Sequence, residues 1–121
     1  MDKEEKYLNV KSLKGILKEN SKGGIKDFSG KIEYSLLPWD SLESVTKILM
    51  LGSKKYGPQN WRKVDRKYYV DALFRHLASF MRGEAVDEES GELHLSHAAC
   101  NILFLIALYG DEAFSIDELG E

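Results

Sequence analysis

Helical spacing of apolar residues is the main pattern in this chain. Residues 66–82 are predicted to form an amphipathic helix that ends at Gly83, because apolar side chains recur on one face at about 100° per residue. These side chains are Val70, Leu73, Phe74, Leu77 and Met81. Residues 93–109 are apolar nearly all round, which is typical of a central, buried helix.

A first helix is expected upstream, starting at Asp40 or Ser41, either of which can cap the free amides of its first turn. We expect it to end at Gly52. Residues 53–56 then form a connecting segment, and the turn-forming residues 57–60 form a second break.

The N-terminal part lacks such a pattern over a long stretch. Residues 7–17 are amphipathic, residues 20–24 indicate a turn, and residues 31–37 alternate weakly as in a short strand or an extended lead-in. The fold class predicted is therefore all-α, a small bundle of about three main helices with a short extended or irregular N-terminal segment. We expect residues 1–30 to be an appendage and residues 31–121 a single helical domain.

Composition places the chain among folded proteins of the cell interior. Its 121 residues are 43% hydrophobic and 31% charged, enough for both a core and solubility. Cys100 is the single cysteine, so no internal disulfide can form, which fits a reducing compartment. No apolar run approaches the roughly 20 residues of a membrane span. We therefore expect a cytoplasmic protein with no membrane partner.

The charges are segregated although the net charge is only −3. Residues 84–121 carry ten acidic and no basic side chains, whereas residues 32–83 carry nine basic and five acidic ones. Such a division suits a ligand whose phosphates need cations and whose metal ion needs carboxylates. A nucleic-acid groove would need a more basic domain, so nucleic acid is not an expected partner.

Three polar residues share one narrow arc of the helix predicted over residues 93–109: His94, His97 and Asn101. Burying them without partners costs about 1–3 kcal/mol each, so side chains, water, a metal or a ligand must satisfy them. In one interpretation these residues form a hydrogen-bonded core network or cap the helix start, with Glu84 or Glu89 folding back as the acceptor. A functional site is the other, and the density of polar groups favours it.

The same region offers two kinds of metal site. Zinc takes His, Cys or carboxylate ligands, and His94 and His97 at i,i+3 supply two of them. Magnesium or manganese prefers oxygen, as supplied by Glu84, Asp87 and Glu89.

Several separated motifs resemble one family, the phage-encoded dATP/dGTP diphosphohydrolase domain of the N-terminal type. The motifs are Lys54-Lys55-Tyr56-Gly57, Asn60-Trp61, Arg75-His76-Leu77, Arg82-Gly83-Glu84, Asp87-Glu88-Glu89-Ser90-Gly91 and His94-Leu95-Ser96-His97-Ala98-Ala99-Cys100-Asn101. The resemblance covers roughly residues 30–110 and implies an all-α fold, related by analogy to MazG-like nucleotide pyrophosphatases. It also implies a phage-encoded protein, which would work in the cytoplasm of the host cell.

The chain departs from the MazG-like metal site, which uses paired acidic residues one helical turn apart. Ala98 and Asn101 stand where one such pair is expected, and Asp71, Arg75 and His76 stand near the other. Any metal ligands are therefore expected among five other residues: Glu84, Asp87, Glu89, His94 and His97.

The function that the resemblance implies is a metal-dependent diphosphohydrolase of purine (d)NTPs that releases pyrophosphate. Mg²⁺ or Mn²⁺ is the expected cofactor, with Glu84 and His97 as catalytic groups that position the attacking water. The expected substrate-binding residues are Lys54, Lys55, Tyr56, Asn60, Trp61, Arg75 and Asn101, with Arg62 as a further cation.

Five of these residues also have a plainer interpretation. Lys54 and Lys55 are ordinary surface charges in many proteins, Tyr56 and Trp61 can anchor a loop or the core, and Arg75 can pair with Asp71 at i,i+4.

Two other functions stay open from the sequence. A phage protein that sequesters a nucleotide or a nucleotide-derived defence signal needs the same cations and aromatics without turnover, and the missing acidic pairs favour it. A purely structural or protein-interaction role is the third. A homo-oligomer, at least a dimer, is expected because three helices make a thin core.

Overall fold

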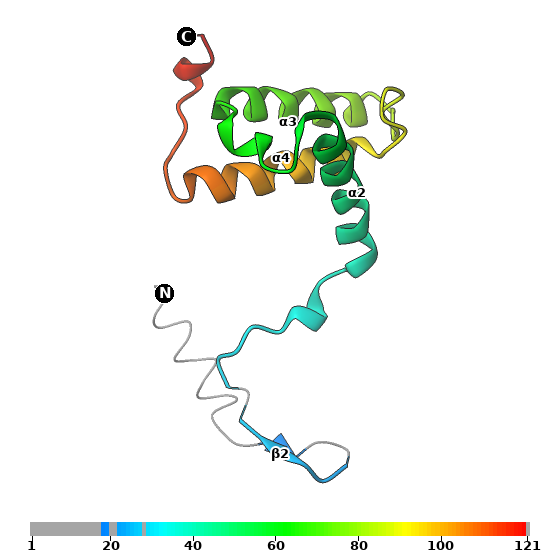
Figure 1. Cartoon of the computed structure of the whole chain (residues 1–121), viewed down its shortest axis with the longest axis vertical. Coiled ribbons are helices and arrows are strands. Elements are labelled where there is room, and N and C mark those ends of the chain that lie inside the picture. The colour runs from blue at the N-terminus through cyan, green and yellow to red at the C-terminus, as the bar shows by residue number, and fades with distance from the viewer. Residues whose placement is uncertain (1–17, 20–21, 28, 121) are drawn as a thin grey trace. The chain divides into compact units, whose positions relative to one another are not determined.

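The computed structural model describes residues 18–19, 22–27 and 29–120, which belong to two compact units that divide between Leu37 and Pro38 (Figure 1). In the first unit, β1 (Lys18–Glu19) pairs antiparallel with β2 (Ile25–Lys26), with Lys18 opposite Lys26. The amphipathic stretch noted over residues 7–17 lies outside the described residues.

The segment 31–37 forms no strand, contrary to one of the two conformations expected for it. Its centre is the single 3₁₀ turn η1 (Tyr34–Leu36). Backbone bonds from Leu36 N–H to Glu33 O and from Leu37 N–H to Tyr34 O, both 3.1 Å, take the groups that a strand would have offered to a neighbour.

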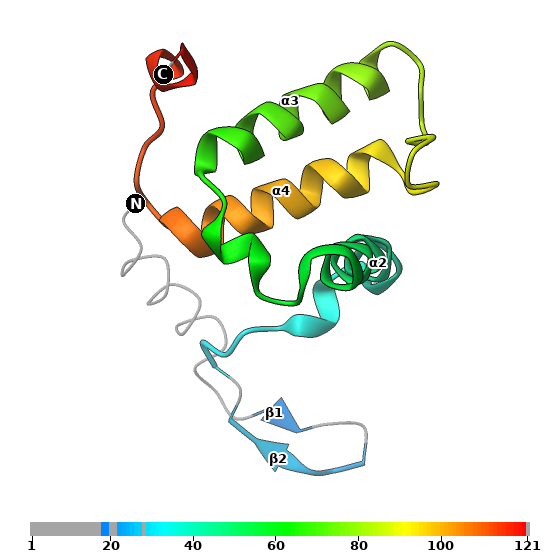
Figure 2. The ribbon, with the colours of Figure 1, turned by 45° about the horizontal axis from the view of Figure 1, so that its top comes forward.

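The second unit is a small all-α bundle, as predicted. Its helices are α2 (Trp39–Tyr56), α3 (Arg66–Met81) and α4 (His94–Tyr109), with the short 3₁₀ segments η2 (Asn60–Lys63) and η3 (Ile116–Gly120). Helices α3 and α4 run side by side in opposite directions, and α2 crosses this pair and packs mainly on α4 (Figures 1 and 2). Within the described residues no helix combines the length and apolarity needed to cross a membrane.

Helix α2 is longer than the sequence indicated. It begins after Pro38, which makes no side-chain cap, so the capping role predicted for Asp40 or Ser41 is wrong. It also passes through Gly52, because a glycine costs only about 1 kcal/mol in a helix. A Cβ at this position would meet no other part of the protein within 4 Å. The helix ends at Gly57, whose φ of 96° disfavours any side chain. Residues 53–56 are therefore its last turn rather than a connection.

Helices α3 and α4 confirm the predicted boundaries to within one residue. Arg82 closes α3 through backbone bonds to Ala78, Ser79 and Phe80, and Gly83 follows with a φ of 100°. Leu93 is the residue that precedes α4. The pair predicted between Asp71 and Arg75 also forms, at 3.5 Å.

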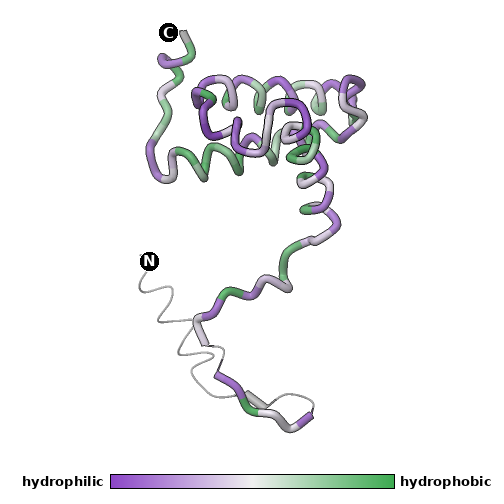
Figure 3. Tube along the Cα trace, in the orientation of Figure 1, coloured by the Kyte–Doolittle hydropathy of each residue, from purple (hydrophilic) through white to green (hydrophobic). Residues whose placement is uncertain are grey.

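The core is thin, and α4 is not buried all round as expected. Val45, Tyr69, Val70, Ala98 and Cys100 are the buried core residues among those described. Four aliphatic residues of α4 are instead 44–60% exposed: Leu95, Ile102, Leu103 and Ile106. Figure 3 shows that the second half of α4 is continuously hydrophobic. Two neighbouring helices do not suffice to cover a helix that is apolar on nearly every face.

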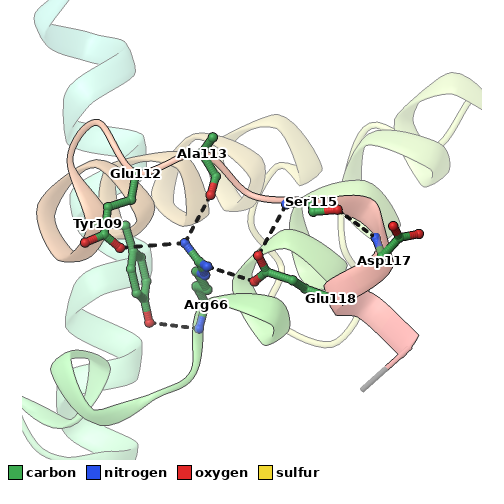
Figure 4. A network of polar contacts seen from close by, with 7 residues as sticks. All are labelled: Arg66, Tyr109, Glu112, Ala113, Ser115, Asp117 and Glu118. Atoms are coloured by element: carbon green, nitrogen blue, oxygen red, sulfur yellow. Dashed lines mark hydrogen bonds and ion pairs between the residues drawn. The ribbon is translucent and has the colours of Figure 1, made fainter.

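A network around Arg66 fixes the C-terminal segment to the start of α3 (Figure 4). The Arg66 guanidinium lies 2.8 Å from a Glu118 carboxylate oxygen and faces the Tyr109 and Phe114 rings at 5.1 Å. Its backbone N–H donates to the Tyr109 hydroxyl at 3.0 Å. This network holds the end of α4 and η3 against α3, away from the histidine residues.

Candidate functional site

The connection between α3 and α4 is folded back onto the two helices by its own backbone bonds. Val86 and Leu93 form an antiparallel bridge, and Asp87 N–H donates to Glu92 O at 2.8 Å. Gly91, with a φ of 75°, completes the turn by donating to Asp87 O at 2.7 Å. The turn brings the acidic connection against the first turn of α4.

All three histidines of the chain meet at this turn. His76 comes from α3, and its ring stacks in parallel on that of His97 from α4, with the ring centres 4.4 Å apart. The Nδ1 atoms of His76 and His94 lie 2.9 Å apart, within hydrogen-bond distance. The structure therefore unites two elements that are separated by a twelve-residue connection.

Tautomers follow from the neighbours of His94. Its Nε2 lies 3.6 Å from a Glu84 carboxylate oxygen, which favours a proton on that nitrogen. With that proton in place, His94 accepts at Nδ1 and His76 donates from its own Nδ1. His76 Nε2 is left without a proton and can accept one or bind a metal.

Ser90 connects the third histidine to a carboxylate. Its hydroxyl donates to Asp87 Oδ2 at 3.0 Å, and its oxygen receives the Glu92 backbone N–H at 3.1 Å. His97 Nε2 lies 2.7 Å from the same hydroxyl oxygen and 3.3 Å from Asp87 Oδ2. Because the Ser90 proton is already given to Asp87, the remaining bond is donated by His97 Nε2.

The environment favours neutral imidazoles beside an ionised carboxylate. Burial, together with the neighbouring imidazoles, lowers the pKa of His76 and of His97, although Asp87 acts in the opposite direction. Burial alone would raise the pKa of Asp87. The hydrogen bonds from Ser90 and from the Glu89 backbone, and the nearby His97 and His76, outweigh it, so the pKa of Asp87 is lowered.

A cleft of about 870 Å³, called the polar cleft for its charged and histidine side chains, opens beside this cluster. The histidines, Asp87, Glu89 and Ser90 line it, and Lys54, Lys55 and Arg75 stand around it from α2 and α3. Cations and carboxylates therefore share one cleft, as the charge distribution along the sequence suggested.

A second, mainly apolar cavity of about 720 Å³ lies beyond α2. Its lining includes Asn60, Trp61, Phe104, Tyr69 and the buried Cys100. Burial raises the pKa of the Cys100 thiol to about 11. Four residues of α2 line both cavities: Ile48, Gly52, Lys54 and Tyr56.

The candidate residues named from the sequence thus fall into separate places. Most of the proposed ligands and cations line the polar cleft, whereas Asn60 and Trp61 line the apolar cavity. Glu84 is 66% exposed at its side chain and faces His94. Asn101 is buried, donates to His97 O at 2.8 Å in its own helix, and is not among the lining residues of either cavity.

Two contributors had no role assigned from the sequence, His76 and Ser90. His76 follows Leu73 by three residues and precedes Leu77, so it lies at the margin of the apolar stripe of α3. That position, in a chain with only three histidines, could have indicated His76 as a site residue. Ser90 follows Asp87 by three residues before a glycine, a spacing that suits a turn with a side-chain hydrogen bond.

Comparison with known proteins places the chain in a protein family. A family model described as "dATP/dGTP diphosphohydrolase, N-terminal" matches residues 21–116. The chain belongs to this family. A protein of the same family description from Salmonella phage PMBT28, named "dATP/dGTP diphosphohydrolase", is 33% identical over 94 residues. These residues are 78% of this chain but 32% of that phage protein, so the chain spans about a third of its relative's length. No solved structure matches.

Proposed function

We propose that this domain binds a purine (d)NTP and, with a divalent metal, hydrolyses it to the nucleoside monophosphate and pyrophosphate. The observation that carries the proposal is the pair of cavities with a common wall of Lys54 and Tyr56 on α2, one lined by charges and the other by aromatic rings. Both volumes lie within the range of about 300–1,000 Å³ usual for small-molecule sites. The name of the phage relative supports the same activity.

The triphosphate would occupy the polar cleft. Lys54, Lys55 and Arg75 supply positive charge on its rim, and Arg75 is held by Asp71 at 3.5 Å without losing access, because its side chain is 68% exposed. Fixed cations around a reacting phosphate stabilise the charge that grows on its oxygens in the transition state.

The base would lie toward the apolar cavity. Tyr56 is the better stacking residue, since its side chain is largely exposed and lines both cavities. The Trp61 ring is already stacked on Phe104 at 4.9 Å and covered by the Arg62 guanidinium at 4.3 Å. We therefore assign Trp61 to the cavity wall and Asn60 to the edge of the base.

Hydrolysis needs a proton acceptor for the attacking water. The new bond joins the water oxygen to the α-phosphorus while the bond from that phosphorus to the bridging oxygen of pyrophosphate breaks. We assign the proton to Glu89, because this residue lines the cleft, as Asp87 does, whereas Glu84 is not among the lining residues. A bound divalent cation would neutralise phosphate charge, and Asp87 and Glu89 offer oxygens of the kind that Mg²⁺ or Mn²⁺ accepts.

Capture without turnover is the second candidate. Capture is favoured because the chain spans only 32% of the phage relative, so catalytic groups can reside in the remainder of that protein. The two candidates need the same cavities and differ in whether pyrophosphate is formed.

The test incubates the purified chain with each dNTP and NTP in Mg²⁺, Mn²⁺ or EDTA and separates the products by chromatography. Metal-dependent release of pyrophosphate from purine nucleotides supports hydrolysis. Intact nucleotides that raise the melting temperature support capture instead, since a ligand at 100 times its Kd adds about 2.7 kcal/mol to stability.

Matched variants identify the residues responsible. Glu89→Gln is expected to slow turnover by about 10²–10⁴-fold with little change in nucleotide affinity. Lys54→Ala is expected to weaken binding, whereas Lys47→Ala, an exposed lysine of the same helix outside both cavities, serves as its control. Equal effects of the two lysine variants would contradict the assignment of the phosphate site.

A further inference from the structure

We propose that His76, Asp87 and His97 form a binding site for one divalent first-row transition metal ion, of which Zn²⁺ and Mn²⁺ are representative, and that the site discriminates against Mg²⁺. This proposal deepens the proposed function and rests on it for the metal's part in hydrolysis. Binding of the metal itself is independent of nucleotide.

The donor atoms are already grouped for an ion. One ligand atom from each of the three residues lies within 4.8 Å of the other two. Donors about 2.1 Å from a tetrahedral ion lie about 3.4 Å apart. His97 Nε2 and Asp87 Oδ2 meet this spacing at 3.3 Å. The His76 ring lies parallel to that of His97, and an imidazole binds a metal in its own ring plane, so the His76 ring must turn out of the stack to bind the same ion.

His76 is arranged as a ligand by its partners. Its Nδ1 is engaged by His94 at 2.9 Å, which leaves Nε2 as the ring nitrogen available to a metal. His94 in turn faces Glu84 at 3.6 Å, and His94 is 5% exposed, so its ring is held in place by the fold. Carboxylate–histidine chains behind a ligating histidine are usual at metal sites, because they set its tautomer and orientation.

Ser90 holds the other two ligands until a metal arrives. Its hydroxyl bridges Asp87 and His97 at 3.0 and 2.7 Å, which keeps their donor atoms on the same side of the turn. Metal binding at His97 Nε2 transfers that ring proton to Nδ1 and replaces the bond to Ser90. Since Ser90 keeps its bonds to Asp87 and to the Glu92 N–H, the turn stays formed.

The kind of metal follows from the donors. Two imidazoles and one carboxylate suit zinc, iron, cobalt, nickel or manganese, whereas Mg²⁺ takes oxygen ligands and keeps its water. Three protein ligands also leave positions for water and for a phosphate oxygen, the arrangement of catalytic rather than structural sites. The site opens to the polar cleft, because all three residues line it.

The experiment titrates the chelator-stripped full chain with Zn²⁺, Mn²⁺ or Mg²⁺ by calorimetry, in the absence of nucleotide. We expect one equivalent of Zn²⁺ or Mn²⁺ to bind, and Mg²⁺ to bind at least about 100-fold more weakly. Long-range ¹H–¹⁵N spectra of the wild-type rings provide a readout that needs no substitution. Zn²⁺ should move the Nε2 signals of His76 and His97 while His94 Nε2 keeps its proton.

Variants test the ligand set. Asp87→Asn and His97→Gln should each lower Zn²⁺ affinity by at least about 100-fold, with helical content verified by circular dichroism. Glu43→Gln, an exposed carboxylate of α2 outside the cleft, should bind as the wild type does. Unchanged histidine signals on addition of Zn²⁺, or equal affinity for Mg²⁺, would overturn the site and show a hydrogen-bonded network only.

The outcome is separable from that of the proposed function. Zn²⁺ bound through the two histidines without nucleotide turnover supports the site and removes the hydrolase assignment. Turnover of nucleotide by a protein whose histidine signals do not respond to Zn²⁺ overturns the site and leaves the hydrolase assignment in place.

Discussion

The Nδ1 atoms of His76 and His94 lie 2.9 Å apart, so one proton is shared between α3 and the first turn of α4. Because His94 is 5% exposed, no water readily replaces it as the partner of His76. This contact fixes both the helix pair and the state of the His76 ring.

Replacement of His94 by Phe should therefore affect stability and metal affinity together. We expect a loss of about 1–3 kcal/mol in unfolding free energy, from the unpaired Nδ1 of His76, and a fall of about 10–100-fold in Zn²⁺ affinity. Urea unfolding without metal measures the loss of stability, and calorimetry with Zn²⁺ measures the loss of affinity. Glu84→Gln, on an exposed side chain, is the milder companion variant, and a larger effect from it than from His94→Phe would contradict this order.

The stability of the metal-free protein should fall as the pH is lowered from 8 to 5. The pKa values of His76 and His97 are lowered in the folded state, first by burial. Below the unfolded pKa of about 6.5 the unfolded chain therefore binds more protons than the folded one, which favours unfolding. The lowered pKa of Asp87 contributes stability that is kept throughout this range and is lost only in stronger acid.

Melting temperatures in EDTA at pH 8 and pH 5 check this dependence. The double variant His76→Gln/His97→Gln should show a weaker pH dependence over the same range, because both titrating rings are gone. An identical slope in wild type and double variant would refute the role of these histidines.

The exposed aliphatic face of α4 should mediate self-association. Leu103 and Ile106 are 46% and 60% exposed on a helix that is apolar all round, and contiguous apolar surface of this kind marks interfaces. We expect sedimentation equilibrium to show a dimer or larger species, which Ile106→Lys shifts toward monomer. Lys47→Ala is the control, and a wild-type monomer at all concentrations would refute the expectation.

Arg66 should control the order of the C-terminal segment rather than the site. Arg66→Ala removes the 2.8 Å contact with Glu118 and the two ring contacts, so we expect a loss of about 1–2 kcal/mol and faster hydrogen exchange over residues 111–120. Arg66→Lys should recover only part of this lost stability, because the lysine ammonium lacks the planar, forked hydrogen-bonding geometry of the guanidinium. Exchange that also rises in residues 84–94 would show that the two networks are coupled.

The spacing of apolar residues along the chain was sufficient to predict the main helices. The stripe from Val70 to Met81 and the positive φ of Gly83 set the limits of α3, and the i,i+4 pair of Asp71 and Arg75 follows from helical geometry alone. The inward arc of His94, His97 and Asn101 was also visible, because helical projection needs only the residues of one helix. Family membership was recognised from the separated motifs, because a motif can be identified without knowing which residues are in contact.

Contacts between elements that are distant in the sequence depend on the tertiary packing. Gly52 stayed helical because a single glycine costs only about 1 kcal/mol and α2 packs on α4, a contact that no local pattern contains. His76 joined Asp87 and His97 only through the folding of the turn at Val86 and Leu93, since contacts across a connection depend on its path. The same long-range packing left the outer face of α4 exposed, and it placed Lys54 and Tyr56 between two cavities.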